Sequence, residues 1–441
     1  MNKIRVLAAP TAFSALMLSG GMVQAVEVDQ IDWSAIPATE VPLFFPGYAS
    51  YQWVLSEEHE GARRVGEGRD CLSCHEGDEA EIGARIASGE VLEPHPIPGK
   101  RGLVNLTVQA AHDDDHLYIR TSWDTAIGEP GQFHEYVRFT DGKWVEYGTH
   151  RGKEVVASGQ AKASYEDRFS MLVGDGTGVP EFNDMGCWAT CHNDMRFMAN
   201  APKGSEVKAH PLLGDEGLKR SDIRKYLPAT RTAMGDTGGW AETRTRAEID
   251  QMKADGAFLD LWQWRANRSN PVGFGGDDYV LEYRLFDAGK NAWFGNWDGG
   301  KGQPRHMLDP ALNNGRMALT EADFRNPEAP TLTADNRVPY DPEHAWQEGD
   351  LMYKYGNQQP EGSASGNAAT ASFEGGRWTV VLTRKLNSGD PDDLPLAGGN
   401  TYPVGFAVHD DSTTARWHYV SWPLTMSLGG TDAHVNAVSL K

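Results

Sequence analysis

All four cysteines of this 441-residue chain lie in two short runs, and each run ends in a histidine. Residues 71–75 read Cys-Leu-Ser-Cys-His, and residues 187–192 read Cys-Trp-Ala-Thr-Cys-His. Four cysteines in an exported chain would normally be read as two disulfides. Their spacing indicates a different chemistry, and that chemistry decides whether the fold can rely on cross-links.

The first run has the C-x-x-C-H pattern that attaches a c-type haem. The thiols of Cys71 and Cys74 add across the haem vinyl groups, and His75 supplies the proximal nitrogen to the iron. A redox-active dithiol would need a βαβ context, which the surrounding sequence lacks, and a zinc site would need two further ligands. We therefore expect a covalent haem c here.

The second run separates Cys187 and Cys191 by three residues instead of two, and we expect the extra residue to bulge outward. Its trailing His192 is the expected proximal ligand of a second haem c. A strained local disulfide and a structural metal-ligand pair are the alternatives. If both haems are present, every cysteine forms a thioether and the fold must hold without disulfides.

The N-terminal 25 residues have the three parts of a secretory signal. Lys3 and Arg5 give a basic start, residues 6–18 are apolar, and residues 23–25 (Val-Gln-Ala) form a small-residue cleavage site. A buried first helix or a permanent anchor is the alternative. No later segment has 18 uninterrupted apolar residues, so we expect a mature protein in the periplasm that does not insert into the membrane.

The charge of the chain restricts its partners. It has 62 Asp and Glu against 41 Lys and Arg, a net charge of −21, and removal of residues 1–25 leaves 39 basic residues and a charge of −23. Sequence-independent nucleic-acid binding needs a basic face and is excluded as a main activity. Docking on anionic lipid is also disfavoured. A redox protein with a basic docking face is compatible with this charge.

The distribution of strand-like and helix-like patterns predicts a mainly β protein. Residues 26–100 form a small, mostly irregular and α segment around the first haem motif, with a weak helix over 79–88. Residues 101–441 alternate apolar and polar residues in short runs between Gly and Asp turns, which favours a β-sandwich with loop and helix insertions. The strand candidates are 104–108, 117–120, 169–173, 279–286, 369–373, 378–383, 404–409 and 416–424, with a hairpin turn at 113–115. A helix is expected over 241–253, and residues 287–365 are expected to be long loops.

The distal iron ligands decide between an electron carrier and an open haem. Opposite His75, the preferred ligand is His59, with His95 as the alternative. Opposite His192, His418 and Met307 are the leading candidates. Other methionines and histidines near the second run are Met185, Met195, Met198 and His210.

Several stretches resemble the haem-binding domain of the ethylbenzene dehydrogenase and dimethyl sulfide dehydrogenase γ subunits, over roughly residues 100–430. They are residues 108–113 with 117–123, 167–168 with 185–192, 261–265, and 405–410 with Ser421-x-Pro. The resemblance implies a β-sandwich related to carbohydrate-binding modules, with haem at one end and a role in periplasmic electron transfer.

The departures from that family alter the expected ligands. The γ subunits hold a non-covalent b-type haem between Met and Lys, whereas this chain has a cysteine pair. Met307 matches the family Met, and His418 stands where the Lys is expected. This makes His418 the first choice for the distal ligand and Met307 the second. It also leaves room for a third, non-covalent haem b between them, which we do not favour.

We therefore expect a dihaem cytochrome c that transfers single electrons between redox partners and is not an enzyme. One rival is a dihaem oxidoreductase that acts on a small inorganic substrate or peroxide at a five-coordinate haem. A second rival is a haem-bearing binding or sensor module. That module would need an exposed aromatic cleft, and Trp293 and Trp297 are the only residues in the sequence that suggest one.

Overall fold

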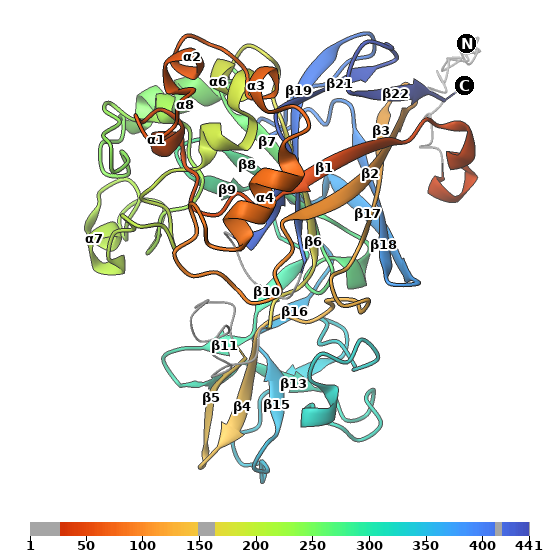
Figure 1. Ribbon diagram of the computed structural model, residues 1–441. Helices are drawn as coiled ribbons and strands as arrows, with labels where there is room; N and C mark the ends of the chain where they lie inside the picture. Colours follow the sequence, from red (N-terminus) through yellow and green to blue (C-terminus); the bar gives the residue numbers. More distant parts are fainter. Residues whose placement is uncertain (1–26, 149–163, 411–416, 441) are drawn as a thin grey trace, which may run out of the picture.

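The structure is a computed structural model of the 441-residue chain, and it describes residues 27–148, 164–410 and 417–440. A main body built on a large sheet lies above a smaller lobe (Figure 1). The expected signal peptide, residues 1–25, lies outside the described residues. In the part of the chain that is described, no helix is long and apolar enough to cross a membrane.

The main body contains a 13-stranded, almost wholly antiparallel sheet, which confirms the mainly β class. Its path runs β17-β18-β3-β2-β1-β20-β19-β6-β7-β8-β9, and β21 and β22 join β19 to β2. The strands are β1 (Thr39–Phe44), β2 (Leu103–His112), β3 (His116–Asp124), β6 (Arg168–Val173), β7 (Leu259–Arg265), β8 (Gly276–Val280), β9 (Arg284–Phe286), β17 (Asn367–Glu374), β18 (Arg377–Lys385), β19 (Thr401–His409), β20 (Tyr419–Val420), β21 (Leu424–Leu428) and β22 (Val435–Ser439).

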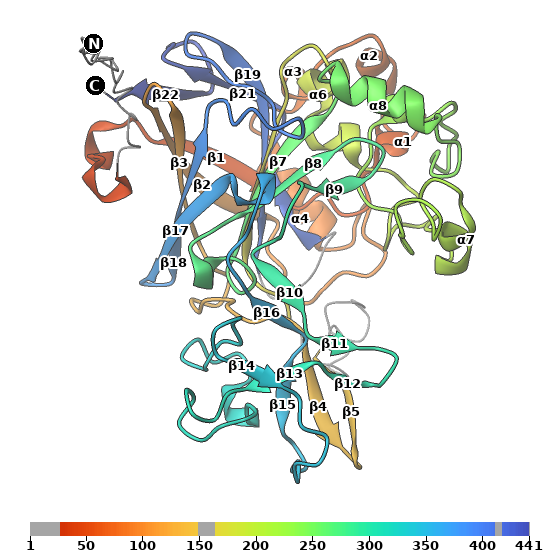
Figure 2. The ribbon, with the colours of Figure 1, turned by 180° about the vertical axis from the view of Figure 1, so that it is seen from behind.

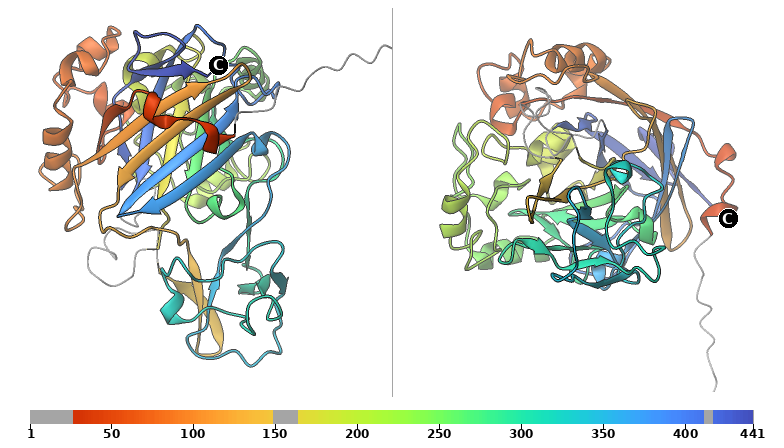
Figure 3. Two further views of the ribbon diagram at one scale, coloured as in Figure 1. Left: turned by 90° about the vertical axis from the view of Figure 1, so that its right-hand side faces the viewer. Right: turned by 90° about the horizontal axis from the view of Figure 1, so that it is seen from below.

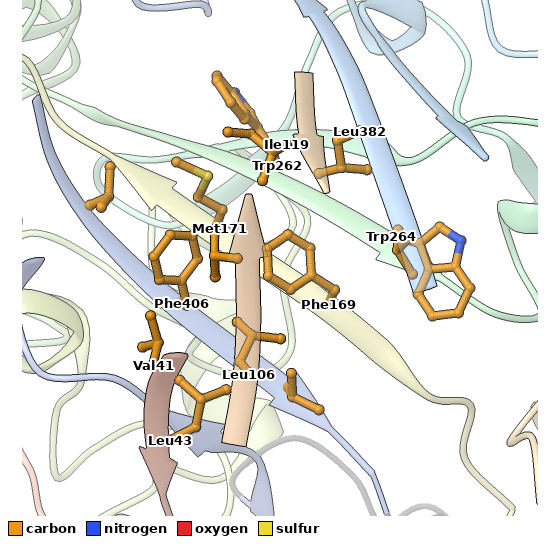
Figure 4. Packing of buried hydrophobic residues seen from close by; sticks show 14 of the residues in the cluster. Val41, Leu43, Leu106, Ile119, Phe169, Met171, Trp262, Trp264, Leu382 and Phe406 are labelled. Carbon is orange, nitrogen blue, oxygen red and sulfur yellow. The ribbon is translucent and has the colours of Figure 1, made fainter. Parts of the chain in front are cut away.

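The two halves of this sheet pack face to face. Trp264 on β7 meets Trp123 on β3 and Trp378 on β18, with ring centroids 6.0 Å and 4.8 Å apart, although these strands are not neighbours in the sheet. Side chains from both halves meet in one apolar core (Figure 4). Seen from the right-hand side of Figure 1, one layer lies in front of the other (Figure 3, left). Burial of this core stabilises a fold of this kind without cross-links.

The N-terminal segment that contains the first cysteine run is part of the same sheet. Strand β1, which comes from the Trp- and Pro-rich start of the chain, pairs with β2 from Thr39 opposite Val108 to Phe44 opposite Leu103. It also pairs with β20 through Phe44 and Val420. The expected boundary at residue 100 is therefore not a boundary in the sheet. Hydrophobic alternation did not reveal β1 because Pro42 interrupts it.

The helices gather on one side of the main body, over the end of the sheet where both cysteine runs lie (Figures 1 and 2). They are α1 (Tyr51–Val54), α2 (Ala62–Gly66), α3 (Leu72–His75), α4 (Glu79–Ala87), α6 (Pro180–Met185), α7 (Gly204–Ala209) and α8 (Arg246–Ala254). The expected helices over 79–88 and 241–253 correspond to α4 and α8. Short 3₁₀ turns connect other elements: η1 (Val28–Gln30), η2 (Trp33–Ala35), η3 (Gly186–Thr190), η4 (Pro228–Thr230), η5 (Asn270–Val272), η6 (Glu321–Asp323) and η7 (Ser363–Ser365).

Residues 287–365 are mostly irregular, as expected, but short strands that the sequence did not predict organise them into a smaller lobe. Its elements are β4 (Tyr136–Thr140), β5 (Lys143–Tyr147), β10 (Trp293–Gly295), β11 (Trp297–Asp298), β12 (Gln303–Pro304), β13 (His306–Leu308), β14 (Arg337–Pro339), β15 (Leu351–Tyr353) and β16 (Tyr355–Asn357). Strand β15 pairs with β4, which comes from far earlier in the chain, so two distant segments share two small apolar cores. Strands of two or three residues are too short for alternation to be read.

Candidate functional site

The first cysteine run forms a single helical turn, α3. The side chain of Asp70 accepts a hydrogen bond from the backbone N–H of Ser73 at 2.7 Å, and the N–H of His75 donates to the carbonyl of Cys71 at 3.0 Å. This turn buries Cys71 and exposes Cys74. Burial, with nearby carboxylates, raises the pKa of the Cys71 thiol to about 12. Both sulfurs are thus presented on one short turn next to His75.

The ring of His59, the preferred distal ligand, lies close to that of His75. The two ring centroids are 6.1 Å apart, and the ring planes differ by 27°. Two imidazoles on opposite sides of one metal have ring centres about 6 Å apart, since each metal–nitrogen bond is about 2 Å. His59 and His75 therefore have the separation that two axial ligands of one iron require.

The Nδ1 atoms of both rings are engaged by the protein. Nδ1 of His59 lies 2.8 Å from the carbonyl oxygen of Val54, and Nδ1 of His75 lies 3.6 Å from Oδ2 of Asp78. Metal-bound histidines commonly use their second nitrogen in this way, because the contact holds the ring and selects the tautomer. The donor set of the first run thus fits a haem with Nε2 of each ring as the coordinating atom.

The second cysteine run forms the 3₁₀ turn η3, which directly follows α6 in the chain. The left-handed Gly186 (φ +53°) starts the turn, and a Cβ there would approach Pro423 to 3.1 Å. The three spacer residues Trp188, Ala189 and Thr190 are all buried. The expected outward bulge was therefore wrong, because the tighter 3₁₀ geometry accommodates the extra residue inside the apolar layer.

His192 is completely buried, and both of its ring nitrogens contact protein groups. Its Nε2 donates to the carbonyl of Tyr226 at 2.8 Å, and its Nδ1 accepts from Nε2 of Gln52 at 3.3 Å. The Tyr226 ring stacks on it at 3.8 Å. Burial lowers the pKa of His192 to about 3, so the ring is neutral. To bind iron through Nε2, His192 would have to give up its bond to Tyr226.

A cavity of about 270 Å³ lies beside the second run, on the face of β6, β7, β19 and β20 that points away from the core between the two sheet halves. Cys187 and Cys191 line it, as covalent attachment of a large group at this run requires. His418 lines it as well, which brings the preferred distal ligand to the cysteine pair. His409 stacks on His418 at 4.9 Å and is a second cavity histidine that the sequence reasoning did not single out. His192 is not among the described residues that line the cavity.

Six basic side chains line the cavity, although the protein is acidic overall, and all of them except Lys225 form ion pairs with Glu166, Asp222 or Asp278. The only carboxylate among the described lining residues is that of Glu135, which is 3.1 Å from Nζ of Lys354. Lys225 donates to Oγ1 of Thr190 in the cysteine spacer at 3.0 Å. Cationic side chains of this kind suit anionic groups such as carboxylates. The basic residues are Arg168, Arg196, Arg224, Lys225, Arg268 and Arg284.

An aromatic stack joins the two cysteine runs. The ring of Trp422 lies 5.2 Å from that of His75, with planes 13° apart, and 5.1 Å from that of Trp188 in the second run. Phe44 at the end of β1 packs on Trp422 at 4.5 Å. Cys71 and Cys187 belong to the same buried apolar cluster. Trp422 had drawn no attention in the sequence, where only the Ser-x-Pro pattern around it was noted.

The structure does not bring Met307 to His418. Met307 lies on β13 in the smaller lobe, buried among apolar side chains that include Trp144 and Trp346. His418 lines the cavity of the main body. The two residues therefore do not form one ligand pair for a third, non-covalent haem. Trp297 is half-buried in the smaller lobe, and the half-buried Trp293 carries the guanidinium of Arg265 at 4.3 Å, so neither forms an exposed aromatic cleft.

Comparison with known proteins agrees with the resemblance seen in the sequence. The chain is 27% identical over 432 residues to a cytochrome c-552 of Stutzerimonas stutzeri, covering 97% of this chain and 96% of that one. It is 31% identical over 182 residues to a cytochrome c-551 of Rhodocyclus tenuis, covering 40% of this chain and 62% of the relative. The family model described as ethylbenzene dehydrogenase matches residues 30–421. The chain therefore belongs to the ethylbenzene dehydrogenase family.

Proposed function

We propose that this protein is an exported dihaem c-type cytochrome that transfers single electrons between redox partners in the periplasm. The proposal rests on one observation. Residues of both cysteine runs lie in the same buried apolar cluster, and the ring of Trp422 contacts a ring of each run. Two redox centres joined by packed aromatic rings form a short path through the protein. The similarity to proteins named cytochrome c-552 and c-551 supports covalent haem c.

Each haem, when bound, supplies an iron that alternates between two oxidation states and so holds one electron. At the first run, Cys71 and Cys74 would hold the haem through thioethers, and His75 and His59 would supply its two histidine ligands. A doubly ligated iron has no position for a substrate, which suits a carrier. Two histidines also favour a lower potential than a histidine and a methionine.

At the second run, Cys187 and Cys191 hold the haem, with His192 as the proximal ligand and His418 as the distal one. The basic wall of the cavity suits the two propionates of a haem, which carry negative charge. Burial holds the His192 ring neutral, which is the form in which histidine binds a metal, and its Nε2 would leave the carbonyl of Tyr226 on binding.

The surface around the first run suits a basic redox partner. Residues 57–81 contain nine Asp and Glu and three Lys and Arg, and Cys74 at their centre is exposed. A partner with a basic face would be steered to this edge, with an association rate that falls as salt rises. Oxidation of the reduced protein by a cationic cobalt complex should be faster than by ferricyanide after correction for driving force, and the difference should shrink in high salt.

The basic cavity also favours a second candidate function, an oxidoreductase that reduces a small anion at the second haem. Arg and Lys side chains around an iron with one open position would attract such a substrate. This candidate requires that His418 does not bind the iron.

A haem count and a ligand-state spectrum separate the two candidates. Purified protein should contain two haems linked by thioethers, and the spectrum of the reduced protein should not change with carbon monoxide. A high-spin haem that binds carbon monoxide would refute the carrier and favour the oxidoreductase. A peptide with free thiols at Cys187 and Cys191 would refute the second covalent haem. As a matched control, His418→Ala should create carbon monoxide binding without changing the first haem.

A further inference from the structure

A cluster of buried aspartates lies at the far edge of the sheet, in residues that the proposed electron transfer does not use. Arg384 on β18 is at its centre, 2.9 Å from Oδ2 of Asp260 on β7 and in contact with Asp277 on β8 and with Asp393. All four side chains are buried. One guanidinium thus serves as the counter-ion of this first group of three carboxylates.

A second group shares Asp393 but has a different composition. Asp287, Asp392 and Asp393 each offer a carboxylate oxygen, and these atoms all lie within 4.8 Å of one another. The three side chains are 4%, 3% and 8% exposed. Both carboxylate oxygens of Asp287 are buried without a hydrogen-bond partner. Among the residues that the structure describes, no Lys or Arg forms an ion pair with Asp287 or Asp392.

Two hydrogen bonds hold the Asp392 carboxylate in this group. Oγ of Ser363 in η7 donates to Oδ1 of Asp392 at 2.7 Å, and the backbone N–H of Ala288 donates to Oδ2 at 2.9 Å. Each oxygen of Asp392 therefore keeps lone-pair capacity for another partner. The three carboxylates therefore form a set of possible metal-donor oxygens, of which the two oxygens of Asp287 have no hydrogen-bond partner.

A buried carboxylate without a partner is costly unless it is neutralised. The five aspartates of the two groups have a single guanidinium between them. Protonation can neutralise the Asp287 carboxylate, and burial together with Asp277 and Asp260 raises its pKa to about 12. A bound cation can also neutralise the carboxylates, and it would at the same time give the oxygens of Asp287 a partner.

We propose that Asp287, Asp392 and Asp393 bind a Ca²⁺ ion. The donors are all carboxylate oxygens, which hard cations prefer, and no nitrogen or sulfur donor belongs to the group. Ca²⁺ accepts mono- or bidentate carboxylates in irregular arrangements and completes its shell with water or backbone oxygens, whereas Mg²⁺ demands near-ideal octahedral geometry.

The position of the site defines what the ion would do. Asp287 directly follows β9, the edge strand of the sheet, and Asp392 and Asp393 lie in the connection from β18 to β19. A cation would tie the sheet edge to that connection and stabilise the native state, because it binds the folded chain and not the unfolded one. The role is structural and independent of the haems.

The test uses the full-length haem-loaded protein, treated with EGTA and returned to calcium-free buffer. Titration calorimetry with CaCl₂ should give one site per chain, and CaCl₂ at about 1 mM should raise the melting temperature by about 3 °C or more. MgCl₂ should give a smaller shift. Absence of both the heat and the shift for CaCl₂ would overturn the proposal, and an equal shift with MgCl₂ would overturn the choice of Ca²⁺.

Asp287→Asn separates a cation ligand from a merely buried carboxylate. In EGTA this variant should melt at or above the wild-type temperature, because it replaces a buried carboxyl group that has no counter-ion by an amide of nearly the same volume. In CaCl₂ it should melt below wild type and bind no ion. The exposed Asp335→Asn is the matched control and should respond to CaCl₂ as wild type does. Wild-type-like calcium binding by Asp287→Asn would refute its role, and Asp392→Asn provides the same comparison if the first variant does not fold.

Discussion

Replacement of Trp422 by leucine tests the link between the two haem runs. The indole ring packs on three other rings, those of His75, Trp188 and Phe44, at 5.2, 5.1 and 4.5 Å. Each such pair contributes about 0.5–1.5 kcal/mol beyond the burial of its area. Leucine keeps an apolar side chain but loses all three pairs, so the free energy of unfolding should fall by about 3 kcal/mol.

The functional effect should be a slower exchange of electrons between the two haems. After flash reduction, the wild-type protein should show a fast internal phase that does not depend on protein concentration, and Trp422→Leu should slow this phase. Trp422→Phe keeps a ring at the position and should lie between the two. Both variants must retain two haems, which the absorbance at the Soret band measures.

A control in the sheet core separates the ring path from a general loss of stability. Trp378 is buried against Trp264 at 4.8 Å in the sheet core and does not line the cavity. Trp378→Leu should lower the free energy of unfolding by a similar amount, about 3 kcal/mol, and leave the internal phase unchanged. If Trp422→Leu loses stability but exchanges electrons as fast as wild type, the aromatic stack is not the path and the reasoning is refuted.

Three further substitutions follow from the site. His59→Ala should open the sixth position of the first haem and make the reduced protein bind carbon monoxide, and an unchanged spectrum would show that another residue is the ligand. Met307→Leu should leave the haem spectra unchanged and cost less than about 1.5 kcal/mol of stability by chemical denaturation, because Met307 packs in the smaller lobe. Gly186→Ala should destabilise by about 1–3 kcal/mol, since φ is +53° and a Cβ would press on Pro423, and reduced haem content at the second run would accompany it. Normal stability in that variant would contradict the positive φ.

The sequence predicted the parts of the fold that show regular alternation. Strands β2, β3, β6, β17, β18 and β19 follow from their apolar periods, and the turn at 113–115 follows from Asp113, which accepts the backbone N–H groups of Asp115 and His116. Strand β20 was expected over 416–424 but is only Tyr419–Val420. Pro423 ends it early because proline has no N–H to donate, which the sequence already shows, whereas the packing of Trp422 on His75, Trp188 and Phe44 is not local in sequence.

The candidate site could be predicted only where its residues lie close together in the sequence. The spacing of Cys71, Cys74 and His75 is a short-range signal, and His59 is close enough along the chain to be weighed. The cavity histidine His409 and the six basic residues of the wall come from distant strands and loops. Their convergence depends on tertiary packing, which no single-sequence pattern encodes.

Strand β1 shows how the two haem runs come to share one rigid support. The segment that precedes the first run enters the main sheet, and its last residue, Phe44, pairs with Val420 on β20. That pairing places the Phe44 ring on Trp422, two residues beyond, and 5.7 Å from Trp188. The separation of the two runs is therefore set by sheet register rather than by a flexible linker between domains. In the dihaem cytochrome that we propose, the two centres would keep a constant separation in this way, because a shift of β1 by one residue would turn Phe44 away from the stack.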